Sequence, residues 1–325
     1  MRITRGQHNL KPRPEGCVVT LGNFDGVHLG HQAVMAQAAE AGRAQGLPLV
    51  AMTFEPLPRE FFDPDQPLAR LTRLRERYRA MAGLGIIDEL VVLHFDSRLA
   101  ALPAEGFVQA ILVGGLSARH VVVGDDFRFG AGRQGDHALL ARLGQIHGFT
   151  VEKARTFLLD GERVSSTRVR AALAEGDLAL ATHLLGRPYA FCGRVAHGDK
   201  RGRTLGYPTA NLALHRRHSP LSGVYVVETA LPDGRLVAGV ANVGRRPTVG
   251  GLRARLEVHL FDFDESLYGQ VIEVRFLHRL RPERQFDSVD MLVRQIGEDA
   301  RMARAWLETG CSDRQAGSPR HSPPT

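Results

Sequence analysis

The sequence is poor in cysteine and has no long apolar run. Three of its 325 residues are cysteine, and they lie far apart, at Cys17, Cys192 and Cys311. This spacing excludes a disulfide scaffold and a cysteine-based zinc finger, and it predicts a reducing, cytoplasmic location. No run approaches the ~18 apolar residues that a membrane span needs. Polar residues such as Thr4 and Lys11 interrupt the start, so we expect no secretory signal peptide.

Charge and length indicate the kind of partner and the number of domains. Lys and Arg number 42 against 35 Asp and Glu, which gives a net charge of +7. A basic balance favours partners that carry phosphate, either nucleotides or nucleic acid. The chain has 325 residues and is 43% hydrophobic, which predicts about two domains with packed cores.

In the first half of the chain, apolar runs alternate with helical patterns. Strands are predicted at 17–21, 49–54, 90–93 and 120–123, and helices at 31–44, 71–84, 136–147 and 167–185. Short β-branched runs separated by helices indicate a parallel sheet that helices cover on both faces. We therefore predict an α/β domain over 1–186.

The pattern changes near residues 186–188. Strands are predicted at 224–227, 236–243, 255–261 and 271–277, with turn formers between them. Short strands with such turns indicate an antiparallel sheet or barrel, in a second domain over 187–310. A helix is predicted at 288–307, with Ser288 as N-cap and Asp290 in its first turn. The Ser, Pro and Arg residues of 311–325 predict a disordered tail.

A run rich in glycine and histidine, Gly-Asn-Phe-Asp-Gly-Val-His-Leu-Gly-His at 22–31, lies between a predicted strand and a predicted helix. Its glycines let a ligand approach the backbone, and a helix start offers N–H groups that suit a phosphate. His28 and His31 are three residues apart, so both can face one phosphate. Histidines also bind metals, but no third ligand lies at a recognisable spacing. The run is neither a Walker A loop nor a Gly-x-Gly-x-x-Gly turn.

Two further stretches carry groups that bind phosphate or nucleotide. The run Val-Ser-Ser-Thr-Arg-Val-Arg at 164–170 places hydroxyls and guanidinium groups where a helix is predicted to begin. They can bind phosphate, or they can form an ordinary capped helix with solvated arginines. Asp126 follows a predicted strand, at the end where open α/β sheets bind ligands. Phe127 and Phe129 fit either a contact with a flat ring or the core.

These three stretches, in this order, resemble the FAD synthetase module of bacterial bifunctional riboflavin kinase/FAD synthetases. The resemblance implies a Rossmann-like nucleotidyltransferase domain of the His-x-Gly-His class. It assigns His28, His31, Ser166, Thr167 and Arg170 to the ATP phosphates, Asn23, Phe24, Asp25 and Gly26 to the nucleotide pocket, and Asp126 to the adenylylation site.

The second half contains a basic glycine-rich loop at 198–206, and Pro-Thr-Ala-Asn follows it at 208–211. Such a loop can wrap a polyphosphate, although a basic surface hairpin or an RNA-binding loop would look similar. Thr209 and Asn211 share one side of an extended chain, and their oxygens suit Mg²⁺. Glu257 lies among apolar residues of a predicted strand, which fits either a solvent-facing position or a general base.

The stretches 193–211, 239–248 and 256–263 resemble a riboflavin kinase domain, whose fold is a small β-barrel with a C-terminal helix. The resemblance implies that Gly198, Gly202 and Arg203 bind nucleotide, that Thr209 and Asn211 bind Mg²⁺ and ATP phosphate, and that Glu257 is the base acting on the ribityl hydroxyl. It implies an enzyme that phosphorylates riboflavin to FMN with ATP, then adenylylates FMN to FAD and releases pyrophosphate. Nucleic acid and membranes are not expected as partners, and an oligomer is compatible with the sequence.

Two other functions fit part of the sequence. A different adenylyl- or cytidylyltransferase with an unrelated barrel would share the histidine run, but not Gly-Tyr-Pro-Thr-Ala-Asn at 206–211. A non-enzymatic RNA-binding protein would fit the charge and the loop 200–203, and its RNA binding would depend strongly on salt. No regular basic-aromatic platform in the sequence supports this second function.

Overall fold

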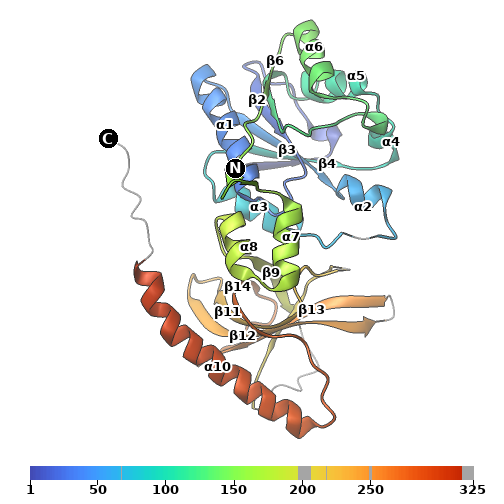
Figure 1. The fold of residues 1–325 in the computed structure, drawn as a ribbon. Coiled ribbons are helices and arrows are strands. Elements are labelled where there is room, and N and C mark those ends of the chain that lie inside the picture. The colour runs from blue at the N-terminus through green and yellow to red at the C-terminus, as the bar shows by residue number, and fades with distance from the viewer. Residues whose placement is uncertain (67, 197–205, 217, 249–250, 317–325) are drawn as a thin grey trace. The chain divides into compact units, whose positions relative to one another are not determined.

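The computed structural model describes residues 1–66, 68–196, 206–216, 218–248 and 251–316. The chain divides into two compact units (Figure 1), which we call unit 1 (Met1–Arg170 with Leu184–Gly186) and unit 2 (Ala171–His183 with Arg187–Thr325). The first domain predicted from the sequence, 1–186, includes residues 171–183, which belong to unit 2 in the structure. The predicted domain boundaries stay a prediction.

Unit 1 is built on a six-stranded sheet in the order β1-β4-β3-β2-β5-β6. Every neighbouring pair of strands is parallel, as predicted. The strands are β1 (Arg2–Arg5), β2 (Cys17–Leu21), β3 (Leu49–Glu55), β4 (Glu89–His94), β5 (Ala118–Val123) and β6 (Thr150–Lys153). The sequence missed β1 and β6, because these short edge strands are largely polar and exposed and lack the apolar run of a buried strand.

Helices cover both faces of this sheet, which confirms the prediction (Figure 1). Alternate strand residues face opposite sides, so Val122 belongs to one core cluster and Val121 to the other. The first cluster includes residues of α1 (Leu29–Gln45) and α3 (Leu74–Ala82). The second includes residues of α5 (Ala104–Phe107), a π-helix (Val108–Val113) and α6 (His137–His147).

Shorter elements complete this part of the chain. They are the helices α2 (Pro58–Phe62) and α4 (Ser97–Ala100), the 3₁₀ helices Gln7–Asn9 and Ala131–Arg133, and the hairpin of β7 (Leu158–Leu159) and β8 (Glu162–Arg163). The single helix predicted over 167–185 is two helices, α7 (Ser166–Glu175) and α8 (Leu178–Leu185). Gly176, between them, has a φ of 83°, and this left-handed conformation ends a helix.

Unit 2 contains a closed antiparallel barrel in the order β10-β13-β12-β11-β14-β9, which confirms the predicted architecture. The strands are β9 (Ala190–Ala196), β10 (Ala210–Ala213), β11 (Gly223–Ala230), β12 (Leu236–Thr248), β13 (Gly251–Leu260) and β14 (Val271–Arg281). Because β9 pairs with both β10 and β14, it closes the ring. The sequence missed β10, which is short, and β9, whose Gly193 and Arg194 interrupt its apolar residues.

The helix α10 (Val289–Ala316) packs on the outside of the barrel, where Ala303 and Trp306 join a cluster with Val226. Its predicted N-cap is confirmed, since the Met291 N–H donates to Ser288 Oγ at 3.2 Å. The helix is longer than predicted, because no proline follows before Pro319. The rest of the predicted disordered tail, 317–325, lies outside the described residues. No helix in the described ranges has the length and apolarity to cross a membrane.

Candidate functional sites

The order of the strands in unit 1 reverses at β2. From β2 the chain continues to β3 and β4 on one side, whereas β5 pairs on the other side. Open α/β sheets bind ligands beyond the carboxyl ends of the strands at such a point. The loop 22–28 follows β2 and leads into α1, and the loop with Asp126 follows β5. The fold therefore brings two of the predicted stretches to the edge where a ligand is expected.

The buried carboxylate of Asp25 is a hydrogen-bonding hub. Its Oδ1 accepts from the N–H and Oγ1 of Thr72, at 2.8 and 3.1 Å, and its Oδ2 accepts from the Leu71 N–H at 3.1 Å. Arg170 Nη2 donates to the same Oδ2 at 2.5 Å, and Ser166 Oγ donates to the backbone oxygen of Asp25 at 2.8 Å. Asp25 is 3% exposed, so these bonds compensate for burying its charge. They join all three of the segments 22–28, 71–72 and 166–170.

Two residues of the stretch 164–170 that were predicted to contact phosphate are engaged within the protein. Arg170 also donates from Nε to the backbone oxygen of Ala69 at 2.9 Å, so both it and Ser166 already hold the loop. The cap of α7 comes from Ser165, whose Oγ accepts from the Arg168 N–H at 3.3 Å. Thr167 lies exposed in the first turn of α7. The roles of these residues toward ATP stay predictions.

His28 and His31 stack on each other at the start of α1. Their ring centroids are 3.6 Å apart and their planes are inclined by 20°. His28 caps the helix, because its Nδ1 accepts from the His31 N–H at 3.3 Å. The buried ring of Phe24 meets His31 edge-on, at 5.4 Å between centroids. Both imidazoles therefore lie at a helix N-terminus, where N–H groups and the helix dipole attract anions.

Two glycines allow the segment 22–31 to pack closely against its neighbours. Gly26 has a φ of 90°, which favours glycine, and its N–H donates to Thr72 Oγ1 at 2.9 Å. A Cβ at Gly30 would lie 3.1 Å from the backbone oxygen of Val164. Glycine at this position therefore lets the stretch 164–170 approach the start of α1.

Arg77 of α3 is an organising residue of this loop that the sequence did not reveal. Its side chain is fully buried, and Nη1 donates to the backbone oxygen of Asn23 at 2.5 Å. Its Nη2 donates to Glu55 Oε2 at 3.0 Å, at the end of β3. Burial lowers the pKa of Arg77 to about 10, so the guanidinium stays charged at neutral pH. Asn23 itself is exposed.

The two aspartates that follow β5 differ in their surroundings. The carboxylate of Asp125 accepts hydrogen bonds, whereas that of Asp126 projects into solvent. Asp125 Oδ1 accepts from Arg163 at 2.6 Å, and Asp125 Oδ2 accepts from Thr156 at 3.2 Å. Asp126 is 77% exposed and lies 3.4 Å from Arg163. Phe129 is buried and stacks on Phe127, at 5.6 Å between centroids. The sequence allowed either a contact with a flat ring or a place in the core for these side chains. Phe129 lies in the core.

In unit 2, Glu257 lies between two asparagines. Asn211 of β10 and Asn242 of β12 are both its direct cross-strand partners, and such partners share one face of a sheet. Because Leu256 and Val258 are buried, Glu257 faces away from the barrel interior, 39% exposed. Asn211 is 8% exposed, and its Nδ2 donates to the backbone oxygen of residue 209 at 3.4 Å. The sequence did not single out Asn242, because strand register is not visible there.

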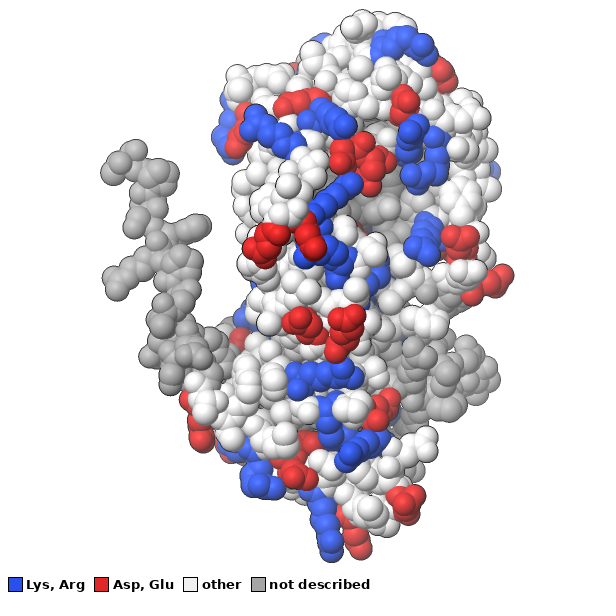
Figure 2. Space-filling model, viewed as in Figure 1, with Lys and Arg blue, Asp and Glu red and all other residues white. Residues whose placement is uncertain are grey.

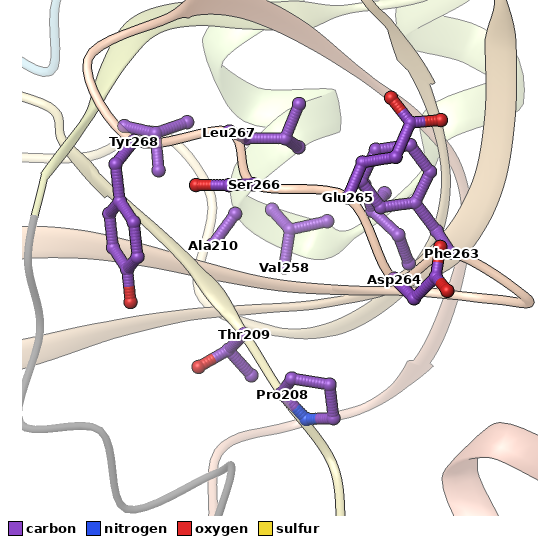
Figure 3. A pocket seen from close by; sticks show the side chains of 12 residues that line it. Pro208, Thr209, Ala210, Val258, Phe263, Asp264, Glu265, Ser266, Leu267 and Tyr268 are labelled. Atoms are coloured by element: carbon purple, nitrogen blue, oxygen red, sulfur yellow. The ribbon is translucent and has the colours of Figure 1, made fainter.

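A pocket of about 360 Å³ opens beside Thr209 (Figure 3). The segment 208–210 and the strand residues Val258 and Leu260 form part of its lining, and the loop 263–268 forms another part. Its volume is in the range of small-molecule sites. Gly198, Gly202 and Arg203 lie outside the described residues. Within the described ranges, no three His, Cys, Asp or Glu side chains are grouped to hold a metal ion.

Comparison with known proteins decides the family. A family model for FAD synthetase matches residues 10–168, and one for riboflavin kinase matches residues 185–307. The bifunctional riboflavin kinase/FMN adenylyltransferase of Escherichia coli K12 is 50% identical over 308 residues, which cover 94% of this chain and 98% of that protein. The chain belongs to the bifunctional riboflavin kinase/FMN adenylyltransferase family.

Other relatives agree with this assignment. The bifunctional riboflavin kinase/FMN adenylyltransferase of Haemophilus influenzae is 45% identical over 95% of this chain and 100% of its own length. A solved structure named as a macrolide-efflux protein from Streptococcus pneumoniae is 35% identical and has a TM-score of 0.80, over 94% of this chain and 100% of that one. That name applies to the Streptococcus pneumoniae protein alone. The similarity of the two structures supports the fold described for this chain.

The enzyme phosphorylates riboflavin to FMN and adenylylates FMN to FAD. Riboflavin, FMN and ATP are its substrates. The match of the barrel to riboflavin kinase removes the alternative of a different nucleotidyltransferase with an unrelated barrel.

The hub at Asp25 gives the first testable prediction. Thr72→Val removes a hydroxyl that donates to the Asp25 carboxylate and accepts from the Gly26 N–H. A hydrogen bond to a charged group contributes about 1.5–3 kcal/mol, so we expect adenylylation of FMN to fall about tenfold or more while riboflavin phosphorylation is unchanged. Product analysis of both reactions checks this. Thr150→Val, which removes a hydrogen-bonded hydroxyl from β6, is the control, and an equal loss in the two variants would contradict the prediction.

Proposed function

We propose that unit 1 adenylylates FMN and that unit 2 phosphorylates riboflavin. The observation that carries the first assignment is the histidine pair at the helix N-terminus beside the reversal of strand order. The second rests on Glu257 and Asn211 as direct cross-strand partners in the barrel. We also propose a cytoplasmic location, which the scarcity of cysteine supports.

In the adenylylation, a phosphate oxygen of FMN attacks the α-phosphorus of ATP. The bond from that phosphorus to the bridging oxygen breaks, and pyrophosphate leaves. His28 and His31 stabilise the charge that builds on the phosphates, and the N–H groups of α1 add to this. Asn23, Phe24 and Gly26 form the nucleotide pocket. Asp25 holds the loop, and Arg170, Ser166, Thr167 and Asp126 complete the site.

In the kinase reaction, Glu257 takes the proton from the terminal ribityl hydroxyl, whose oxygen attacks the γ-phosphorus of ATP. ADP leaves with the electrons of the broken bond. Phosphoryl transfer depends chiefly on positioning and charge neutralisation. The pocket beside Thr209 takes the adenosine end of ATP, and Gly198, Gly202 and Arg203 bind its phosphates.

Mg²⁺ fits the donors that Thr209 and Asn211 provide. A hydroxyl and an amide oxygen are hard, uncharged ligands, so ATP phosphates and water complete the shell and balance the charge. The Asn211 amide is held in place by its hydrogen bond to the backbone at residue 209. When bound, Mg²⁺ neutralises the charge of the transferred phosphate.

The charge on the face shown in Figure 2 does not favour the RNA-binding alternative. Figure 2 shows Lys and Arg side chains interspersed with Asp and Glu over the visible face. Nucleic-acid-binding proteins gather basic side chains into a patch or stripe.

ATP analogues test the two proposed bond cleavages in the full chain. With α,β-methylene ATP and Mg²⁺, we expect riboflavin to be converted to FMN and no FAD to form, because the bond to the α-phosphorus cannot break. With the β,γ-imido analogue, we expect FMN to become FAD while riboflavin is not phosphorylated. Chromatography of the flavins reports both results. FAD formation from the methylene analogue would overturn the proposed attack on the α-phosphorus.

A further inference from the structure

A surface hairpin contacts the loop that lines the pocket of unit 2. Arg235 lies in the turn between β11 and β12, and its Nη1 and Nη2 donate to the two carboxylate oxygens of Glu265 at 2.7 and 2.9 Å. Its guanidinium carbon is 5.9 Å from the ring centroid of Phe263. Glu265 and Phe263 both line the pocket (Figure 3). The hairpin therefore holds part of the pocket lining from outside.

Asp233 holds the side chain and the backbone of Arg235 in place. Its Oδ2 accepts from Arg235 Nε at 2.7 Å, and its Oδ1 accepts from the Arg235 N–H at 3.0 Å. Hydrogen bonds from Arg235 lower the pKa values of Asp233 and Glu265, so all three groups are charged at neutral pH. Isolated exposed ion pairs contribute little, but a forked pair within a network of charges is the favourable case.

The far end of the same loop is attached differently. The Gly269 N–H donates to the Val195 oxygen at 2.9 Å, and the Val195 N–H donates to the Gln270 oxygen at 2.8 Å. Leu267 is buried as well. Backbone hydrogen bonds thus fasten residues 269–270 to β9, whereas the forked pair with Arg235 fixes the side chain of Glu265 in the middle of the loop.

We propose that Arg235 is a positioning residue for ATP in the kinase reaction. By holding Glu265, it keeps the segment 263–266 in the conformation against which the adenosine end of ATP packs. This inference rests on the proposed assignment of the pocket to ATP. Arg235 lies behind the pocket lining and acts through Glu265, so it affects nucleotide binding and not the chemical step.

Charge reversal tests this in the full-length enzyme. In Arg235→Glu, we expect the KM for ATP in riboflavin phosphorylation to rise about threefold, the size of effect of an exposed ion pair. The kcat, the KM for riboflavin and the adenylylation of FMN should stay unchanged. Because Asp233 pairs with Arg235 as well, the rescue variant also removes that carboxylate: Asp233→Asn/Arg235→Glu/Glu265→Arg restores the forked pair with reversed charges and should return the KM for ATP to its original value. A fall in kcat, or a triple variant no better than the single one, overturns the proposal.

Two controls separate the possible failures. Arg275→Gln removes another arginine of unit 2 that pairs with two carboxylates, Glu228 and Glu273, outside the pocket lining, and it should leave the KM for ATP unchanged. Ser266→Trp fills the pocket from an exposed position. If it leaves the KM for ATP unchanged, the pocket assignment fails and the role of Arg235 fails with it. If Ser266→Trp raises that KM and Arg235→Glu does not, only the role of Arg235 fails.

Discussion

Replacing His28 and His31 together with alanine is expected to abolish FAD formation while FMN formation from riboflavin continues. Removing one donor that stabilises transition-state charge costs about 10²–10³ in rate, so the double variant should lose at least about 10³-fold. The loss of the His28 cap costs about 1 kcal/mol, and circular dichroism monitors the fold of the variant. Riboflavin phosphorylation, which we propose for unit 2, reports on the integrity of that unit.

The measurement is flavin chromatography after incubation with ATP and either riboflavin or FMN. His8→Ala, which removes an exposed histidine from unit 1, is the matched control and should retain both reactions. Equal loss of both reactions in a folded double variant would contradict the division of labour between the units. Undiminished FAD formation would remove the histidines from the mechanism.

Glu257→Gln is expected to have the opposite pattern. Loss of a general base costs about 10²–10⁴ in rate, so FMN production should fall by that factor while FMN is still converted to FAD. Glutamine preserves the size of the side chain and its place between Asn211 and Asn242. The barrel should therefore keep its thermal stability.

Steady-state phosphorylation of riboflavin checks this second prediction, and circular dichroism monitors the fold. Glu228→Gln is the control, because Glu228 is a carboxylate of β11 that pairs with Arg275 and lies outside the pocket lining. Full kinase activity in Glu257→Gln would show that the attacking hydroxyl does not need this base.

The sequence predicted the central strands of unit 1 and the long strands of the barrel, because both are marked by apolar residues. β1, with the sequence Arg-Ile-Thr-Arg, carries no such mark. It is ordered by pairing with the buried strand β4, and this long-range contact is invisible to local patterning. The helix break at Gly176 was missed for a related reason, since glycine is tolerated in helices and its left-handed conformation depends on its surroundings.

The candidate site was predicted unevenly. The histidine run identified the helix start, because residue type and spacing alone carry that signal. Thr72 and Arg77 were missed, because their importance comes from burial and from contacts with distant groups, the Asp25 carboxylate and the backbone oxygen of Asn23. Arg77 lies in Leu-Arg-Glu-Arg-Tyr-Arg-Ala-Met-Ala, a sequence typical of a solvated helix. A buried arginine among exposed ones cannot be recognised before the fold is known.

The strand pair that closes the barrel contains a proposed magnesium ligand. Asn211 of β10 pairs with Ala196 of β9 on one side and with Glu257 of β13 on the other. Separation of β9 from β10 would remove one of the two strands that hold Asn211, so the open form would bind metal and nucleotide poorly. By mass action, metal and nucleotide bound at the kinase site would therefore stabilise the closed barrel against local opening.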